Sequence, residues 1–330
     1  MIRRALFLLV MSFLLAWGCG QVAPATPPLQ LGLPIACPAN QNCFVLQYPD
    51  RDPGPGAQDF GCGRMTSDGH QGTDFAIPDE QVMAQGVQVT AVAAGNVLRL
   101  RDGVPDRRLR GDQPAAEIQG IECGNGVVLD HGQGWQTQYC HLRQGSVAVQ
   151  PGDLITEGQN LGLVGVSGKA SFPHVHLTVW HQGQVVDPFV GPDAKPGCQG
   201  PQLSLWKDPL PYTPTGLIRA GFAPKLPDLE ALWSGEFKET SLPVTTPAVV
   251  FWVQTYGVLE GDREQIQLFD PKGEVAAELE RSLSKSQRVW VSAIGKRGTQ
   301  TPLIPGRWYG KYQLIRDGTV LVDVEQDVRL

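Results

Sequence analysis

Residues 172–180 read FPHVHLTVW, and their alternation of apolar and polar side chains is typical of a β-strand. The apolar members recur at every second position, which places them on one face: Val175, Leu177 and Val179. That face is expected to pack against a core. The other face carries His174, His176 and Thr178, so two imidazoles lie side by side on the side of the strand opposite the apolar set.

Short strand patterns of this kind fill most of the chain. The clearest in the N-terminal half are residues 87–93, 95–101, 126–130 and 135–142, separated by turns rich in Gly, Pro and Asp. The 330 residues include 39 Gly and 27 Pro, and long helical periodicity is scarce. We therefore predict an all-β protein.

Composition shifts divide the chain into five parts. Residues 1–19 resemble a lipoprotein-type signal peptide, and residues 20–44 are expected to form a Pro-rich tether. Residues 45–195 contain the histidine motifs. A Pro-rich linker is predicted at 196–240, followed at 241–330 by a small immunoglobulin-like β-sandwich without His or Cys.

The N-terminus predicts export to the cell envelope. Arg3 and Arg4 precede an apolar run from Ala5 to Ala16 that is too short to span a bilayer. Gly18 and Cys19 then follow as at a lipoprotein cleavage site, which predicts a membrane tether through a lipidated Cys19. An ordinary cleaved signal is the alternative.

The cysteine count agrees with export. Without Cys19, six cysteines remain, and an exported protein can pair all of them. Six cysteines allow 15 connectivities. The preferred set is Cys37–Cys43 in a short loop, Cys123–Cys140 across a predicted hairpin, and Cys62–Cys198 as the remaining pair.

The net charge of the chain indicates which classes of molecule it is expected to bind. The formal net charge is −6 and no basic stripe is present, so nucleic acid is not an expected partner. The polar loop at 102–120 carries three arginines: Arg107, Arg108 and Arg110. We expect this loop to be solvated, with a clamp for substrate carboxylates as the alternative.

Three histidine motifs carry the predicted chemistry. GHQGTDFAIP contains His70 and Asp74, which share a face of an extended segment. QTQYCHL contains Tyr139 and His141, which are predicted to share one face of a strand, and the third motif is FPHVHLTVW. Two neutral imidazoles and one carboxylate, with a fourth position open, suit catalytic zinc. Zinc lowers the pKa of a bound water molecule to about 7, and further imidazoles can move its proton or stabilise an oxyanion.

In their order and in the phrases between them, these motifs resemble the lysostaphin-like (LytM-type) zinc metallopeptidases over about residues 60 to 190. The resemblance implies a twisted antiparallel sheet or barrel-sandwich with a groove across it. It implies one Zn²⁺ per chain on His70, Asp74 and His176, with His141 and His174 as catalytic histidines. The implied activity is a metalloendopeptidase that cuts peptidoglycan stems or cross-bridges, whose peptides would be the partner.

Two departures from the family bear on specificity: Thr178 stands where many relatives carry an acidic residue, and the 102–120 loop is an insertion at the expected groove rim. Neither departure changes a residue that is predicted to bind the metal. The alternative functions are a non-hydrolytic wall-binding protein, or activator of another wall hydrolase, and a lipoyl-type carrier. A carrier needs a lysine at a hairpin tip, where Lys169 fits poorly. Tyr139 is expected either to line the cleft or to pack in the core.

Overall fold

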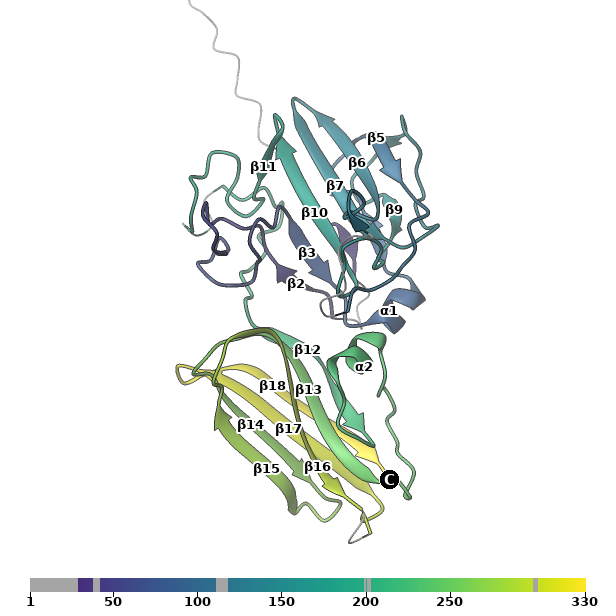
Figure 1. Ribbon diagram of the computed structural model, residues 1–330, viewed down its shortest axis with the longest axis vertical. Coiled ribbons are helices and arrows are strands. Elements are labelled where there is room, and N and C mark those ends of the chain that lie inside the picture. The colour runs from purple at the N-terminus through teal and green to yellow at the C-terminus, as the bar shows by residue number, and fades with distance from the viewer. Residues whose placement is uncertain (1–28, 38–41, 111–117, 199, 201–202, 299–301) are drawn as a thin grey trace, which may run out of the picture.

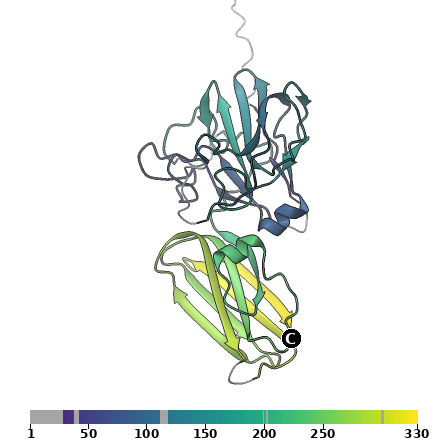
Figure 2. The same cartoon turned by 45° about the vertical axis from the view of Figure 1, so that its right-hand side comes forward.

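Antiparallel strands build two lobes that lie end to end (Figures 1 and 2). The structure is a computed structural model that describes residues 29–330 except 38–41, 111–117, 199, 201–202 and 299–301. The N-terminal lobe contains β1 to β11, and the C-terminal lobe contains β12 to β18. The predicted all-β class is confirmed, since the described helices, α1 (Glu80–Gln85) and α2 (Leu229–Ser234), are short.

One large sheet forms the scaffold of the N-terminal lobe. Its strands are ordered β2-β3-β10-β7-β6-β5-β8, with β11 added against β10. Their bounds are β2 Phe44–Gln47, β3 Thr73–Ala76, β5 Gly95–Arg101, β6 Asn125–Gly132, β7 Trp135–Leu142, β8 Leu154–Ile155, β10 His174–His181 and β11 Gln184–Val186. The alternation predicted for residues 172–180 is confirmed, because the valines and leucine of β10 lie in the core, at most 1% exposed.

A smaller sheet corrects the predicted tether. It consists of β1 (Ile35–Ala36), β4 (Gln88–Thr90) and β9 (Asn160–Leu163). Leu31 and Ile35 are buried in the core, so residues 31–36 belong to the N-terminal lobe rather than to a free tether. Proline spacing did not reveal this, because the strand partner of β1 lies more than fifty residues away.

The C-terminal lobe is a sandwich of two antiparallel sheets, ordered β12-β13-β16 and β15-β14-β17-β18. Their bounds are β12 Gly216–Ala223, β13 Ala248–Val258, β14 Arg263–Phe269, β15 Val275–Ser282, β16 Gln287–Arg297, β17 Arg307–Arg316 and β18 Thr319–Arg329. Apolar residues of both sheets share one core. The predicted linker is wrong for its second half, because β12 and α2 lie within 196–240 and β12 is a sheet strand.

Ion pairs and aromatic rings join the lobes. Asp79, which caps α1, pairs with Arg219 of β12 and with Lys238. Phe44 of β2 stacks on Tyr256 of β13 with ring centroids 5.0 Å apart. Trp233 and Tyr256 belong to the same buried cluster as the N-terminal core. The apolar core therefore continues across the lobe boundary, which favours a fixed arrangement of the lobes.

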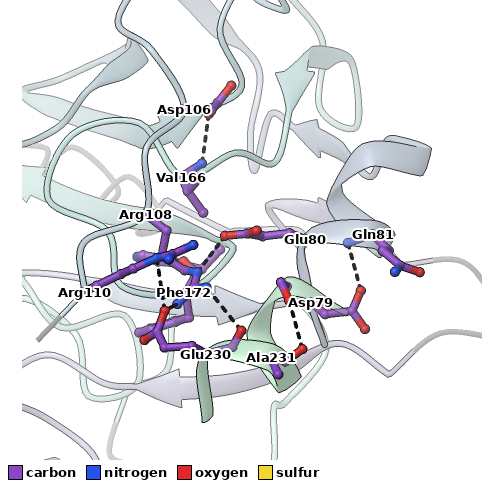
Figure 3. A network of polar contacts seen from close by, with 12 residues as sticks. Asp79, Glu80, Gln81, Asp106, Arg108, Arg110, Val166, Phe172, Glu230 and Ala231 are labelled. Atoms are coloured by element: carbon purple, nitrogen blue, oxygen red, sulfur yellow. Dashed lines mark hydrogen bonds and ion pairs between the residues drawn. The ribbon is translucent and has the colours of Figure 1, made fainter. Parts of the chain in front are cut away.

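Figure 3 shows how the 102–120 loop takes part in this junction. Arg108 is only 5% exposed, and its guanidinium bonds Glu80 of α1 (2.6 Å) and Glu230 of α2 (2.9 Å). The expectation of a solvated loop is therefore wrong at Arg108, because these two carboxylates come from distant segments. Arg110, with 59% of its side chain exposed, pairs with Glu230 at the surface.

The disulfides match the preferred set: Cys37–Cys43, Cys62–Cys198 and Cys123–Cys140. The Cys123–Cys140 bond connects the segment just before β6 with β7, as expected for a bridge across this hairpin. The predicted signal peptide and Cys19 lie outside the described residues. Within the described residues, none of the helices is long and apolar enough to cross a membrane.

Candidate metal centre

Pairing of β3 with β10 creates the centre. Asp74 of β3 is the direct cross-strand partner of His176 of β10. His70 lies four residues before Asp74, just after a turn in which Gly69 has φ +70° and the His70 amide donates to the Ser67 carbonyl. Strand pairing and this turn therefore bring the three predicted ligands to one point.

The donor atoms of these residues fit a single metal ion. One ligand atom from each of His70, Asp74 and His176 lies within 4.8 Å of the others. Asp74 Oδ1 is 3.2 Å from His70 Nε2 and 2.8 Å from His176 Nδ1. Two imidazoles and a carboxylate are the donor set of an open zinc site.

Hydrogen-bonding groups around the centre orient the side chains of His70 and His176. The second nitrogen of His70, Nδ1, lies 2.8 Å from the Tyr48 carbonyl oxygen. His176 Nε2 lies 3.0 Å from the Thr178 hydroxyl oxygen, which leaves Nδ1 turned toward the centre. Such contacts select the ring orientation of metal-binding histidines.

Gln47 is a site residue that the sequence analysis missed. Its side-chain amide donates to Asp74 Oδ2 over 2.8 Å, and both residues are buried. The bond depends on the pairing of β2 with β3, which are separated by a long loop. The only local signal was a polar residue closing an apolar strand pattern.

His141 and His174 lie beside the three potential ligands. Their ring centroids are 4.6 Å apart. His141 Nδ1 is 2.8 Å from the Ser167 carbonyl oxygen, and His174 Nδ1 is 2.8 Å from that of Phe172. Because a carbonyl can only accept, both Nδ1 atoms carry hydrogen, and both Nε2 atoms present lone pairs when the rings are neutral.

Burial and neighbouring charges set the ionisation of the cluster. Burial lowers the pKa of both His141 and His174, so these rings are neutral at neutral pH. Burial alone would raise the pKa of the Asp74 carboxyl, but the neighbouring His70 and His174 hold it well below its usual range. The centre therefore combines an ionised carboxylate, Asp74, with two neutral imidazoles, His141 and His174, whereas, against the effect of burial, the neighbouring Asp74 raises the pKa of His70.

Tyr139 does not line the groove. It is fully buried in the core, and its hydroxyl accepts a hydrogen bond from the Val92 amide over 2.9 Å. Gln138, Cys140 and His141 line the groove instead. The predicted shared face of Tyr139 and His141 is wrong because His141 has φ +63°, which interrupts the strand alternation and turns its side chain to the groove.

The centre lies in a groove of about 560 Å³ on the face of the large sheet. Leu109 of the inserted loop and Phe172 contribute to its walls. The Phe172 ring stacks on His174 at 4.3 Å and contacts Trp233 of α2 at 5.7 Å. The C-terminal lobe thus supports one wall of the groove.

The two remaining histidines lie outside the groove. His131 bridges the Ala94 carbonyl and the Thr137 hydroxyl, which is a structural role. His181 is half-buried and stacks on Trp135 with centroids 4.1 Å apart.

Comparison with known proteins gives a family match for this part of the chain. Residues 68–188 match the family described as Peptidase family M23. Over 118 residues the chain is 30% identical to the peptidoglycan DD-endopeptidase ShyB and 31% identical to ShyA, both from Vibrio cholerae. Each alignment covers 36% of this chain and 22% of the relative, so the chain spans about a fifth of the length of these relatives.

A solved structure also matches about half of this chain. A putative peptidase M23 from Pseudomonas aeruginosa is 29% identical, with 48% of this chain and 52% of that chain covered. The TM-score is 0.28, which is too low to support a statement about the shape of the whole molecule.

Proposed function

We propose that this chain, whose residues 68–188 carry a domain of peptidase family M23, is a zinc-dependent endopeptidase that hydrolyses peptide bonds in peptidoglycan stems or cross-bridges. The observation that supports this most directly is the convergence of His70, Asp74 and His176 on one point at the floor of a groove. Zinc, when bound there, supplies a Lewis acid that activates water.

The two further histidines of the groove, His141 and His174, would transfer protons during the reaction. In His141 and His174 the Nε2 atom carries the lone pair, because each Nδ1 faces a backbone carbonyl. His174 Nε2 lies 3.6 Å from Asp74 Oδ1, and the His141 ring centroid lies 6.0 Å from that of His176. We assign to this pair the acceptance of a proton from the attacking water and the stabilisation of charge on the carbonyl oxygen of the scissile bond. Either ring could perform either role, since both are neutral and buried.

We also propose that the protein acts in the cell envelope, tethered to a membrane through a lipidated Cys19. Three disulfides in the structure favour an oxidising compartment. The relatives ShyB and ShyA are named as peptidoglycan DD-endopeptidases, which supports an envelope location for this chain. Mass spectrometry of the mature N-terminus tests the lipid directly, and an unmodified N-terminus would contradict it.

The test of function is digestion of purified peptidoglycan by the full chain. We expect soluble fragments whose masses identify the cut bond, loss of these fragments with a chelator, and recovery on adding zinc. His176→Ala should lose both zinc and activity. His181→Ala is the matched control, because His181 lies outside the groove.

A chain that binds peptidoglycan but releases no chelator-sensitive fragment would support the non-hydrolytic, wall-binding alternative instead. A chain that neither binds nor cuts would contradict both functions.

A further inference from the structure

A second cavity, of about 620 Å³, lies between the two lobes. The segment around Cys62 to Ser67 forms its N-terminal-lobe wall, and residues 257–259 at the end of β13 and 286–288 at the start of β16 form the opposite wall. Ser67 also lines the groove of the metal centre, so the two hollows adjoin. We call this cavity the arginine pocket, after Arg64, Arg288 and Arg316 in its lining.

The charge of the arginine pocket is unbalanced. All its lining residues are among those that the structure describes, and none of them is Asp or Glu. Arg316 is neutralised by Asp262 through two hydrogen bonds of 2.7 and 2.8 Å. Arg64 and Arg288, in contrast, have no carboxylate partner within the described part of the chain, so two positive charges face the cavity.

Arg288 links the pocket to the metal centre. Its guanidinium donates to the Thr66 carbonyl over 2.6 Å, which holds it at the boundary between the lobes. Thr66 precedes Ser67, which lines both the pocket and the groove of the metal centre, so an anionic group bound beside Arg288 would lie next to that groove.

We propose that the arginine pocket binds a free carboxylate of the substrate peptide and thereby helps to select which bond reaches the metal centre. A guanidinium pairs with a carboxylate through two parallel hydrogen bonds, which gives both strength and orientation. The partly exposed Leu259 lines the same cavity, with the core residues Met65 and Val258 beside it, and this apolar lining suits the aliphatic part of such a residue. This proposal rests on the proposed peptidase function and adds a specificity site to it.

The test compares two synthetic wall peptides that differ only in one carboxylate, free in one and amidated in the other. With the zinc-loaded full chain, we expect Arg64→Gln and Arg288→Gln to raise KM for the free-carboxylate peptide about tenfold. KM for the amidated peptide should change less than twofold. Arg64 makes no polar contact among the described residues, so Arg64→Gln tests charge without loss of a structural bond. Arg307→Gln, with an arginine 68% exposed elsewhere on the C-terminal lobe, is the control.

A binding measurement separates this proposal from the proposed function. Calorimetry with metal-stripped protein measures peptide binding whether or not hydrolysis occurs. Tighter binding of the free-carboxylate peptide, lost in Arg64→Gln, supports the pocket. Equal binding of both peptides, equal effects of the variants on both, or binding of inorganic phosphate in place of the carboxylate peptide would overturn it.

Discussion

Substitution of Thr178 by Val tests whether the hydrogen bond to His176 tunes metal affinity. The Thr178 hydroxyl oxygen lies 3.0 Å from His176 Nε2, and Thr178 is only 3% exposed. Valine keeps the shape of the side chain but removes the hydroxyl. The imidazole of His176 then loses the contact that holds its Nδ1 toward Asp74.

The expected loss follows from the strength of one bond. A neutral hydrogen bond contributes about 1 kcal/mol net, and 1.4 kcal/mol corresponds to about tenfold in a dissociation constant. Water has little access to replace the hydroxyl at this buried position. We therefore expect about fivefold weaker zinc binding, somewhat less than the roughly tenfold minimum that is usual for outer partners of metal ligands.

The assay is competition for zinc between the protein and a coloured chelator at fixed pH. Thr73→Val is the matched control, because Thr73 is next to Asp74 and its buried hydroxyl has no hydrogen-bond partner among the described residues. This control should leave zinc affinity unchanged and should not lower stability. A Thr178→Val dissociation constant within twofold of the wild type, or an equal change in Thr73→Val, would refute the reasoning.

Three further predictions concern stability. Arg108→Ala should lower the free energy of unfolding in urea by about 3 kcal/mol because it removes a buried guanidinium and its two charge-assisted hydrogen bonds, to Glu80 and Glu230, whereas Arg110→Ala, at an exposed ion pair, should change it by about 0.5 kcal/mol or less. Burial raises the pKa of Asp187 to about 6, so the wild-type fold loses stability as pH rises from about 4 to about 6; Asp187→Asn should be more stable by up to about 3 kcal/mol at pH 7.5 and equal at pH 4, and a constant difference across this range would contradict the assignment. Removing the bond between Cys62 and Cys198, which are 136 residues apart, should cost about 5 kcal/mol by loop-closure entropy, and an unchanged melting temperature of the double Ser variant would argue against it.

Local patterns explain what could be read without a structure. The strand at residues 174–181 follows from an alternation within nine residues, and the burial of Val175 and Leu177 agrees with it. Short motifs also carry the family resemblance that implied His70, Asp74 and His176 as ligands, and the structure has their potential ligand atoms within 4.8 Å of one another. Periodicity identifies such features because a strand repeats every two residues wherever it lies in the fold.

Contacts between distant segments could only be decided by the tertiary structure. Gln47 reaches Asp74 because β2 pairs with β3, and Arg108 is buried because α1 and α2 each present a carboxylate to it. The single backbone irregularity at His141 moved this ring to the groove and left Tyr139 in the core, against the expected alternation. Sequence by itself determined the strands and the donor types in this protein. The packing of the two lobes decided which surfaces meet, and therefore where the arginine pocket lies. That packing depends on many weak apolar and ionic contacts between distant residues, which no local sequence pattern records.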